Sequence, residues 1–257
     1  GDLMDKVLVD KAVEGSDIVY LTVGLDYKFK VWQTKWPAIM QNTIDACKKH
    51  NARFVFFDNA YMYDPNFMDN LTEETPVNPI SKKGKVRSAI AQNLLHEMKS
   101  GGIKGMIVRA SDFYGPGIHT SVMMETGYWR MKSGKKPIWL GNPLAWHSMT
   151  FTPDAAKATA LLGNTINCYQ QIWHLPTESQ KLTGKQWIEL FAREMNRPAR
   201  FIALRGKFIR FIGLFVPFFK ELGEMIYQME SNYFFNCDKF RNHFPEFKIT
   251  SPDEGIK

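Results

Sequence analysis

The sequence predicts an α/β fold with a doubly wound parallel sheet and a smaller C-terminal domain. Three short apolar runs indicate strands that are buried on both faces, and two stretches with helical periodicity separate them. The strands are Ile18–Gly24, Arg53–Asn59 and Met106–Arg109, and the helices are Trp36–Lys49 and Ala89–Gly101. Strand and helix therefore alternate along the chain, which is the order of a parallel sheet covered by helices.

The same patterns define the remaining elements. A short helix, Val7–Val13, ends before Gly15, and the second long helix ends at a pair of glycines. Beyond Gly117 the order is less regular, with a helix at Pro153–Leu162, a strand at Ile172–Leu175 and a helix at Thr183–Met195.

Polar residues follow the three strands. Gly24 ends the first strand, Asp58 and Asn59 end the second, and Ser111 and Asp112 follow the third. In open parallel sheets ligands bind outside the carboxyl ends of the strands. We therefore expect these residues to converge on one binding rim.

The charge and the cysteine content limit the kinds of protein to which this chain can belong. The 257 residues carry 33 basic and 26 acidic side chains, a net charge of +7, with no run of five like charges. This excess favours either an anionic partner or scattered charge that serves solubility. Three scattered cysteines exclude a disulfide framework, and the histidines and cysteines lack metal-ligand spacing. A reducing, cytoplasmic location follows as an expectation.

One apolar run, 208–219, is too short to span a bilayer, contains Arg210 and breaks at Pro217. We expect a buried helix–turn segment there; a segment lying on a membrane or a partner is the alternative.

A basic nucleic-acid or membrane-surface protein is the weakest hypothesis for the whole chain. We therefore expect neither a nucleic-acid partner nor a membrane span.

Six segments in a fixed order resemble the extended short-chain dehydrogenase/reductase family, the NAD(P)-dependent epimerases and dehydratases of nucleotide-sugar type. Arg109–Gly117 resembles the family's Arg-Pro-x-x-x-Tyr-Gly-Pro-Gly and is the most specific match. The other segments are Gly1–Asp5, Glu14–Tyr20, Arg53–Tyr63, Asn78–Ser81 and Phe151–Ala158. The resemblance covers nearly the whole chain, although each match alone is weak.

The resemblance implies a Rossmann-like sheet for residues 1–117 and a mainly substrate-binding domain for 118–257, with 151–176 packing back on the first. It implies NAD or NADP as cofactor and a nucleotide-sugar-like substrate. The implied cofactor-binding residues are Asp2, Leu3, Val23, Gly24, Asp58, Arg87, Ala110 and Ser111, and the implied substrate-binding residues are Tyr61, Asp112, Trp146 and His147.

The catalytic positions depart from the family. Asn59 stands at the Ser position, Lys83 at the Tyr position and Arg87 at the Lys position, which makes the chain an atypical member. Arg87 can still bind ribose hydroxyls, and Asn59 can still donate a hydrogen bond. Lys83 lies four residues before Arg87 on a helix, where a like charge favours the neutral amine that accepts a proton. The alternative is a solvated helix start.

Two further assignments stay open. Tyr61 is either a displaced phenolic acid or an aromatic lining of the substrate cleft. His147, which follows Trp146 in a loop, is either a substrate contact or a hydrogen-bonded structural residue.

A glycine-rich pyrophosphate turn is absent from these 257 residues. We expect the first βαβαβ half to lie upstream of residue 1; a shortened relative that forms a homodimer is the alternative. The predicted function is that of an NAD(P)-dependent epimerase, dehydratase or reductase. The alternative is an inactive NAD(P)- or ligand-binding protein that acts as a sensor or interaction module.

Overall fold

The computed structural model describes residues 1–118 and 121–257, which divide into two compact units that interleave in sequence. The first unit comprises residues 1–63, 76–109 and 159–173. The second comprises 64–75, 110–158 and 174–257. The predicted domain boundary at residue 117 stays a prediction, and each unit is described by itself.

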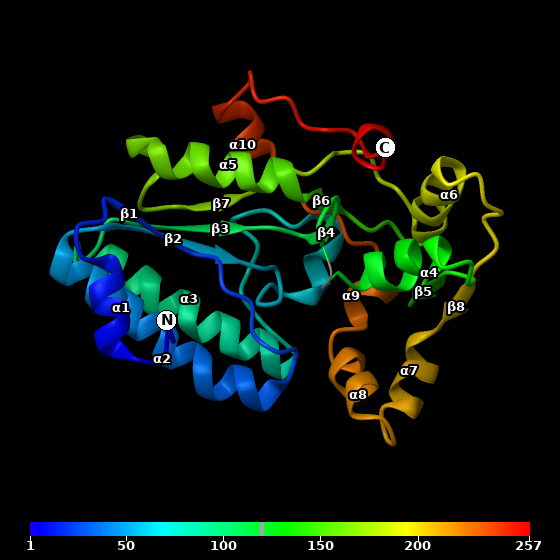
Figure 1. The fold of residues 1–257 in the computed structure, drawn as a ribbon, viewed down its shortest axis with the longest axis horizontal. Coiled ribbons are helices and arrows are strands. Elements are labelled where there is room, and N and C mark those ends of the chain that lie inside the picture. Colours follow the sequence, from blue (N-terminus) through cyan, green and yellow to red (C-terminus); the bar gives the residue numbers. More distant parts are fainter. Residues whose placement is uncertain (119–120) are drawn as a thin grey trace. The chain divides into compact units, whose positions relative to one another are not determined.

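The first unit is built on a four-stranded sheet in the order β1-β2-β3-β7 (Figure 1). The strands are β1 (Ile18–Leu21), β2 (Arg53–Asp58), β3 (Gly105–Arg109) and β7 (Ile172–His174). β1 pairs with β2 and β2 with β3 in parallel. The predicted parallel α/β sheet is therefore confirmed. β1 forms one edge of it, and Tyr20 on this strand is exposed.

Helices cover this sheet because their apolar faces need burial. The helices are α1 (Lys6–Val13), α2 (Phe29–His50) and α3 (Lys82–Lys99), with the single turn η3 (Ile166–Cys168). α2 and α3 lie on one face of the sheet (Figure 1). Their buried side chains, among them Ile44 and Leu94, pack with Phe54 and Phe56 of β2 into one core. Burying such aliphatic side chains is the main stabilising contribution to the unit.

The start of α2 was predicted wrongly. The helix begins at Phe29 rather than at Trp36, so Pro37 lies inside it. Proline usually breaks a helix because it lacks an N–H and crowds the preceding turn. Here Trp32 and Trp36 are both buried on one face, and burial of this face outweighs the cost of one missing hydrogen bond.

The second unit contains two pairs of short parallel strands and several short helices. β4 (Asp112–Tyr114) pairs with β6 (Met149–Phe151), and β5 (Ile138–Leu140) pairs with β8 (Ile202–Leu204). The helices are η1 (Pro65–Asn70), η2 (Met124–Tyr128), α4 (Trp129–Lys132), α6 (Gly184–Glu194), α7 (Gly206–Ile212), α8 (Pro217–Gly223), α9 (Tyr227–Glu230), α10 (Asp238–His243) and α11 (Pro252–Gly255). The helix α5 (Thr152–Asn164) contributes residues to both units.

Aromatic and Met side chains form the core of the second unit. Tyr114 packs on Trp187 with ring centroids 5.0 Å apart, and Trp139 lies in the same cluster. Gly184 opens α6 because a Cβ there would meet the ring of Trp139 at 2.1 Å. The capping box between Thr183 and Gln186 fixes the same end of the helix.

The expected burial of the 208–219 segment is wrong. Phe208, Phe211, Leu214 and Phe215 are all exposed, whereas Ile209 of α7 is fully buried. Among the described residues, no helix combines the length and the apolar character that crossing a bilayer requires.

We predict that the three cysteines are inert to alkylation in the native protein. Cys47, Cys168 and Cys237 are all buried and free, and burial raises the pKa of Cys47 to about 12. Because the thiolate is the nucleophile, a buried, protonated thiol does not react. Mass spectrometry after iodoacetamide treatment should show no modified thiol in buffer and three in guanidinium chloride. Rapid labelling of any one of them in buffer would contradict this packing.

Candidate functional site

One buried carboxylate, Asp58 at the end of β2, binds two buried arginines. Arg87 donates from Nε to Oδ1 of Asp58 at 2.7 Å, and Nη2 of Arg87 lies 2.5 Å from the same oxygen. Arg109 donates from Nε to Oδ2 of Asp58 at 3.2 Å. β2, β3 and α3 each contribute one of these side chains. The carboxylate therefore ties both strands to the helix.

The cluster of Asp58, Arg87 and Arg109 carries more positive than negative charge. Burial acts to lower the pKa of Arg109, but the nearby Tyr63 and Asp58 outweigh it and raise the pKa overall. The Arg109 guanidinium lies 4.8 Å from the Tyr63 ring centroid. Its buried Nη1 has no hydrogen-bond partner among the described residues. The carboxylate and the aromatic face together keep this cation in the interior.

Aromatic rings surround the Arg87 guanidinium. Its carbon lies 4.4 Å from the ring centroid of Trp36, 4.8 Å from that of Phe56 and 5.9 Å from that of Trp32. Its Nη2 also donates to the carbonyl oxygen of Phe57 at 3.2 Å. Arg87 is 3% exposed. Its Nε and Nη2 donors are thus directed into the protein, and little of the side chain is left for contact with a ribose hydroxyl.

Lys83 is the second cation on this face of α3, and its side chain is fully buried. The ammonium nitrogen lies 4.4 Å from the ring centroid of Tyr27. Tyr27 in turn contacts Trp32 edge-on, with centroids 5.7 Å apart. Lys83 is therefore not part of the solvated helix start that was one of its two interpretations. It belongs to a set of aromatic rings and cations that also includes Arg87.

The amino end of α3 packs tightly against the loop after β2. Ser81 accepts a hydrogen bond from the backbone N–H of Gly84 at 3.0 Å, which caps the helix. A Cβ at Gly84 would meet the carbonyl oxygen of Tyr61 at 2.4 Å. Glycine at this position therefore allows the approach that buries Lys83.

Asn59 and Tyr61 lie at the carboxyl end of β2 and are only half-buried. Asn59 Oδ1 accepts a hydrogen bond from the backbone N–H of Tyr61 at 3.1 Å, which fixes the turn. The Tyr61 ring stacks on Trp32, with centroids 6.1 Å apart and planes 13° apart. Of the four predicted catalytic residues, these two are the ones that reach solvent.

The predicted cofactor residues near the amino end are at the surface or half-buried. Asp2 is exposed and accepts a hydrogen bond from the backbone N–H of Met4, while Leu3 packs against the core. Val23 is half-buried beyond β1. At Gly24 an added Cβ would meet nothing within 4 Å, so the backbone there borders open space.

In the second unit the structure pairs two predicted substrate residues. Nε2 of His147 lies 2.7 Å from Oδ2 of Asp112, and the imidazole stacks on Tyr233 at 4.8 Å. His147 is buried, and its Nδ1 has no partner among the described residues. The preceding residue, Trp146, lies under the ammonium group of Lys181. His147 thus has the packing of a structural residue, and its partner Asp112 is partly exposed.

Ala110 and Ser111 are buried in the second unit. The Ser111 hydroxyl lies 2.8 Å from the Thr150 hydroxyl, which lies 2.8 Å from that of Thr177. This chain of hydroxyl groups is internal to the unit.

Several residues of the site were not predicted as such. Arg109 stood in a recognised motif but received no role, and Trp32 and Trp36 were not assigned to the site. Their spacing of four residues on one helix was the available signal, since such residues share a face. No pattern in the sequence indicates which cation they would cover.

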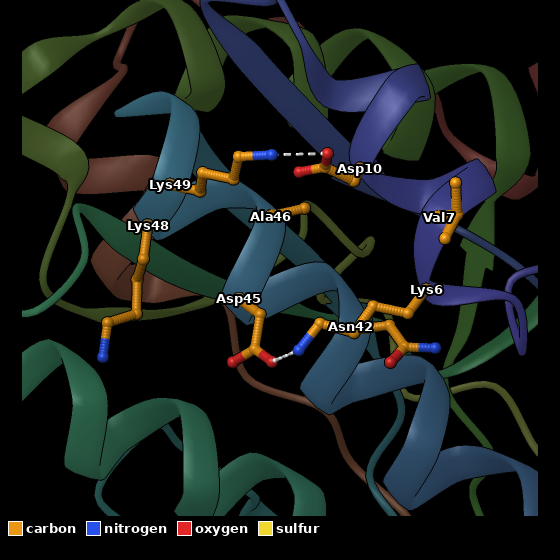
Figure 2. A pocket seen from close by; sticks show the side chains of 8 residues that line it. All are labelled: Lys6, Val7, Asp10, Asn42, Asp45, Ala46, Lys48 and Lys49. Atoms are coloured by element: carbon orange, nitrogen blue, oxygen red, sulfur yellow. Dashed lines mark hydrogen bonds and ion pairs between the residues drawn. The ribbon is translucent and has the colours of Figure 1, made fainter.

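A separate pocket of about 460 Å³ lies between α1 and α2 (Figure 2). Its charges are paired, because Lys6 binds Asp45 at 2.8 Å and Lys49 binds Asp10 at 2.6 Å. It is lined by Lys6, Val7, Asp10, Asn42, Asp45, Ala46, Lys48 and Lys49, none of them a predicted site residue. Among the described ranges, no group of His, Cys, Asp and Glu residues could hold a metal ion.

We predict that Asp58→Asn destabilises the protein by about 3 to 5 kcal/mol. The substitution keeps the size of the side chain but leaves two buried guanidinium groups without a counter-charge. The free energy of unfolding from urea denaturation measures the loss.

Asp45→Asn is the matched control, because it breaks the exposed Lys6–Asp45 pair. Exposed pairs contribute at most about 1 kcal/mol, so the control should remain close to the parent protein. Equal losses in the free energy of unfolding for the two variants would contradict the prediction, because the buried Asp58 pairs would then stabilise the protein no more than the exposed pair.

Comparisons with known proteins identify the family of this chain. The family model described as "NAD dependent epimerase/dehydratase family" matches residues 1–170. No curated protein matches the sequence.

Solved structures share the fold at low sequence identity. The dTDP-glucose 4,6-dehydratase DesIV from Streptomyces venezuelae, a double mutant solved with NAD, superposes with a TM-score of 0.78 at 14% identity, covering 100% of this chain and 77% of its own. UDP-glucuronic acid 4-epimerase from Bacillus cereus, in complex with NAD, gives 0.77 at 15%, covering 100% and 76%. The enzyme WbmH from Bordetella bronchiseptica, in complex with NAD+, gives 0.73 at 18%, covering 100% and 78%.

The family model spans well over half of the chain, and the solved structures share the α/β fold observed in the first unit. The chain belongs to the NAD-dependent epimerase/dehydratase family.

Proposed function

We propose that the protein binds NAD(P) and acts on a nucleotide-sugar-like substrate as an epimerase, dehydratase or reductase. The family match supports the reaction class. Similar solved structures are those of sugar-nucleotide dehydratases and epimerases with NAD bound. The observation that carries the proposal is the pair of half-buried polar side chains, Asn59 and Tyr61, at the carboxyl end of β2.

Two of the predicted cofactor-binding positions, Gly24 and Arg87, differ in how well they fit a dinucleotide. Gly24 borders open space just beyond β1, so a ligand can approach the backbone of Val23 and Gly24. The Arg87 guanidinium fits a ribose contact poorly, because Nε and Nη2 already bind Asp58 and the Phe57 carbonyl oxygen and the side chain is buried. Val23 and Gly24 would therefore hold the dinucleotide, and when bound it supplies the acceptor and donor of a hydride.

The chain's own polar groups handle the substrate oxygen in this proposal. Tyr61 gives or takes a proton at its phenolic oxygen, and Asn59 donates a hydrogen bond from Nδ2 to the same substrate oxygen. Arg87 and Lys83 act as positioning residues through Trp32. This ring lies near Arg87, stacks on Tyr61 and contacts Tyr27, the ring beside Lys83.

A second candidate function is ligand binding without turnover. The burial of Lys83 and the pairing of Arg87 with Asp58 favour it, since neither cation reaches solvent. A cytoplasmic location and a homodimer complete the proposal as expectations.

Tyr61→Phe should lower turnover by about a hundredfold or more while leaving dinucleotide binding unchanged, because general acid–base groups contribute at least that factor. NADH and NADPH binding is measured by cofactor fluorescence. Turnover is measured with dTDP-glucose and UDP-glucuronic acid as probes.

Tyr20→Phe is the control, since Tyr20 is an exposed phenol on β1 of the same unit. The parent protein binding a dinucleotide without turning over either sugar would favour the second candidate. Binding of neither NADH nor NADPH would exclude the enzymatic proposal, and full activity of Tyr61→Phe would remove Tyr61 from it.

A further inference from the structure

The helical hairpin of α7 and α8 exposes apolar side chains that nothing in the second unit covers. Phe208 is 50% exposed, Phe211 59%, and Leu214 and Phe215 75% each. α7 and α8 lie side by side, joined by the turn that carries Leu214 and Phe215 (Figure 1). Single exposed apolar residues are ordinary, but a contiguous group of this size marks an interaction surface.

The hairpin is an ordered element with an anchored base. A Cβ at Gly213 would stand 3.0 Å from the backbone of Lys220, so glycine allows the turn to close tightly against α8. Ile209 of α7 is fully buried, and Leu222 of α8 and Met225 just after it are also buried. The buried residues hold the base of the hairpin in the unit, and the exposed ones form its free side.

The exposed charge on the hairpin is mainly positive. Glu221 of α8 and Glu224 after it are half-buried, and Arg205 pairs with Glu230. Residues 197–220 contain six basic side chains and no acidic one. The chain has 33 basic and 26 acidic residues, so the rest of it carries 27 and 26 and is almost neutral. The six cations, all exposed, are Arg197, Arg200, Arg205, Lys207, Arg210 and Lys220. Exposed cations thus border the apolar group, and Lys207, Arg210 and Lys220 lie on the hairpin itself.

Aromatic and aliphatic side chains bordered by cations match the chemistry of an anionic bilayer surface. Apolar side chains enter the boundary between headgroups and acyl chains, while Lys and Arg contact lipid phosphates. A second copy of the chain is a poorer occupant, because it would set the exposed Lys207, Arg210 and Lys220 of two copies against one another. Nucleic acid matches the cations but gives no burial to Leu214 and Phe215.

We propose that the α7–α8 hairpin docks the protein on anionic phospholipid membranes, with Leu214 and Phe215 inserted and the flanking cations on the headgroup phosphates. This peripheral docking is independent of the proposed dinucleotide chemistry, because every residue it uses lies in residues 197–220.

Co-sedimentation with large unilamellar vesicles tests the proposal. One set consists of phosphatidylcholine alone, and in the other about a third of the lipid is phosphatidylglycerol. The parent protein should pellet with the anionic vesicles, and added salt should release it. Lys207→Glu with Lys220→Glu should weaken binding roughly twentyfold or more, since each cation near the surface contributes about a fivefold factor. Leu214→Asp with Phe215→Asp should abolish it.

Two matched controls separate the hairpin from general surface charge and apolarity. Lys135→Glu with Lys136→Glu makes the same change of charge at exposed positions outside the hairpin. Leu144→Asp with Ile166→Asp makes the same apolar-to-acidic change at exposed side chains. Both controls should bind vesicles as the parent does. Circular dichroism establishes that each variant is folded, and Phe208→Ser with Phe211→Ser replaces the Leu214 and Phe215 pair if that variant is not.

Three results would overturn the proposal. The first is failure of the parent to pellet with anionic vesicles at low salt, and the second is equal weakening by the control pairs. The third is a lipid-free dimer, or a complex with DNA in place of vesicles, that the Leu214 and Phe215 substitutions disrupt; either would assign the hairpin to another occupant.

Discussion

The pairing of one carboxylate, Asp58, with two guanidinium groups is the constraint on which the first unit depends. Its oxygens bind Arg87 of α3 and Arg109 of β3, and all three side chains are almost completely buried. A buried charge is stable only when it is paired and hydrogen-bonded, so the removal of the one anion would leave two cations in a core of aromatic rings. Helix α3 is therefore fixed on the sheet by charge as well as by apolar contact.

This pairing decides which side chains at the carboxyl edge of the sheet are accessible to a ligand. The Arg87 donors Nε and Nη2, which bind Asp58 and the Phe57 carbonyl oxygen, are not available to a ligand. Arg87 and Lys83 are enclosed by the rings of Trp36 and Tyr27, whereas Asn59 and Tyr61 remain half-exposed on the same edge of the sheet. The positions that resemble the family's catalytic pair thus serve as a buried support, and the neighbouring turn presents the accessible groups.

The architecture of the first unit could be predicted from the sequence because apolar periodicity reports burial directly. The strands β1, β2 and β3 and the helix α1 lie where the pattern placed them, whereas α3 begins at Lys82, before the predicted start at Ala89. The pairing of Arg87 with Asp58 could not be predicted, since the two residues are 29 apart in sequence and the pattern does not say which polar groups meet. The start of α2 was missed because Pro37 marks a helix start in most contexts, and only the burial of Trp32 shows otherwise.

The second unit shows a different limit of prediction from the sequence. The run from Phe208 has the composition of a core segment, and composition alone cannot distinguish a buried face from one reserved for a partner. Asp112 and His147 were each predicted as site residues, whereas their pairing at 2.7 Å appears only when β4 and the loop before β6 are brought together. Local patterns thus define elements, and the tertiary fold decides what each exposed or polar residue contacts.

The most direct test of the central constraint is a double-mutant cycle between Asp58→Asn and Arg87→Met, measured as the free energy of unfolding in urea. Residues in one buried ion-pair network couple by up to about 3 kcal/mol. The account predicts a coupling of about 2 kcal/mol or more between these two positions. A coupling near zero would contradict it, because the carboxylate and the guanidinium would then contribute independently to the stability of the protein.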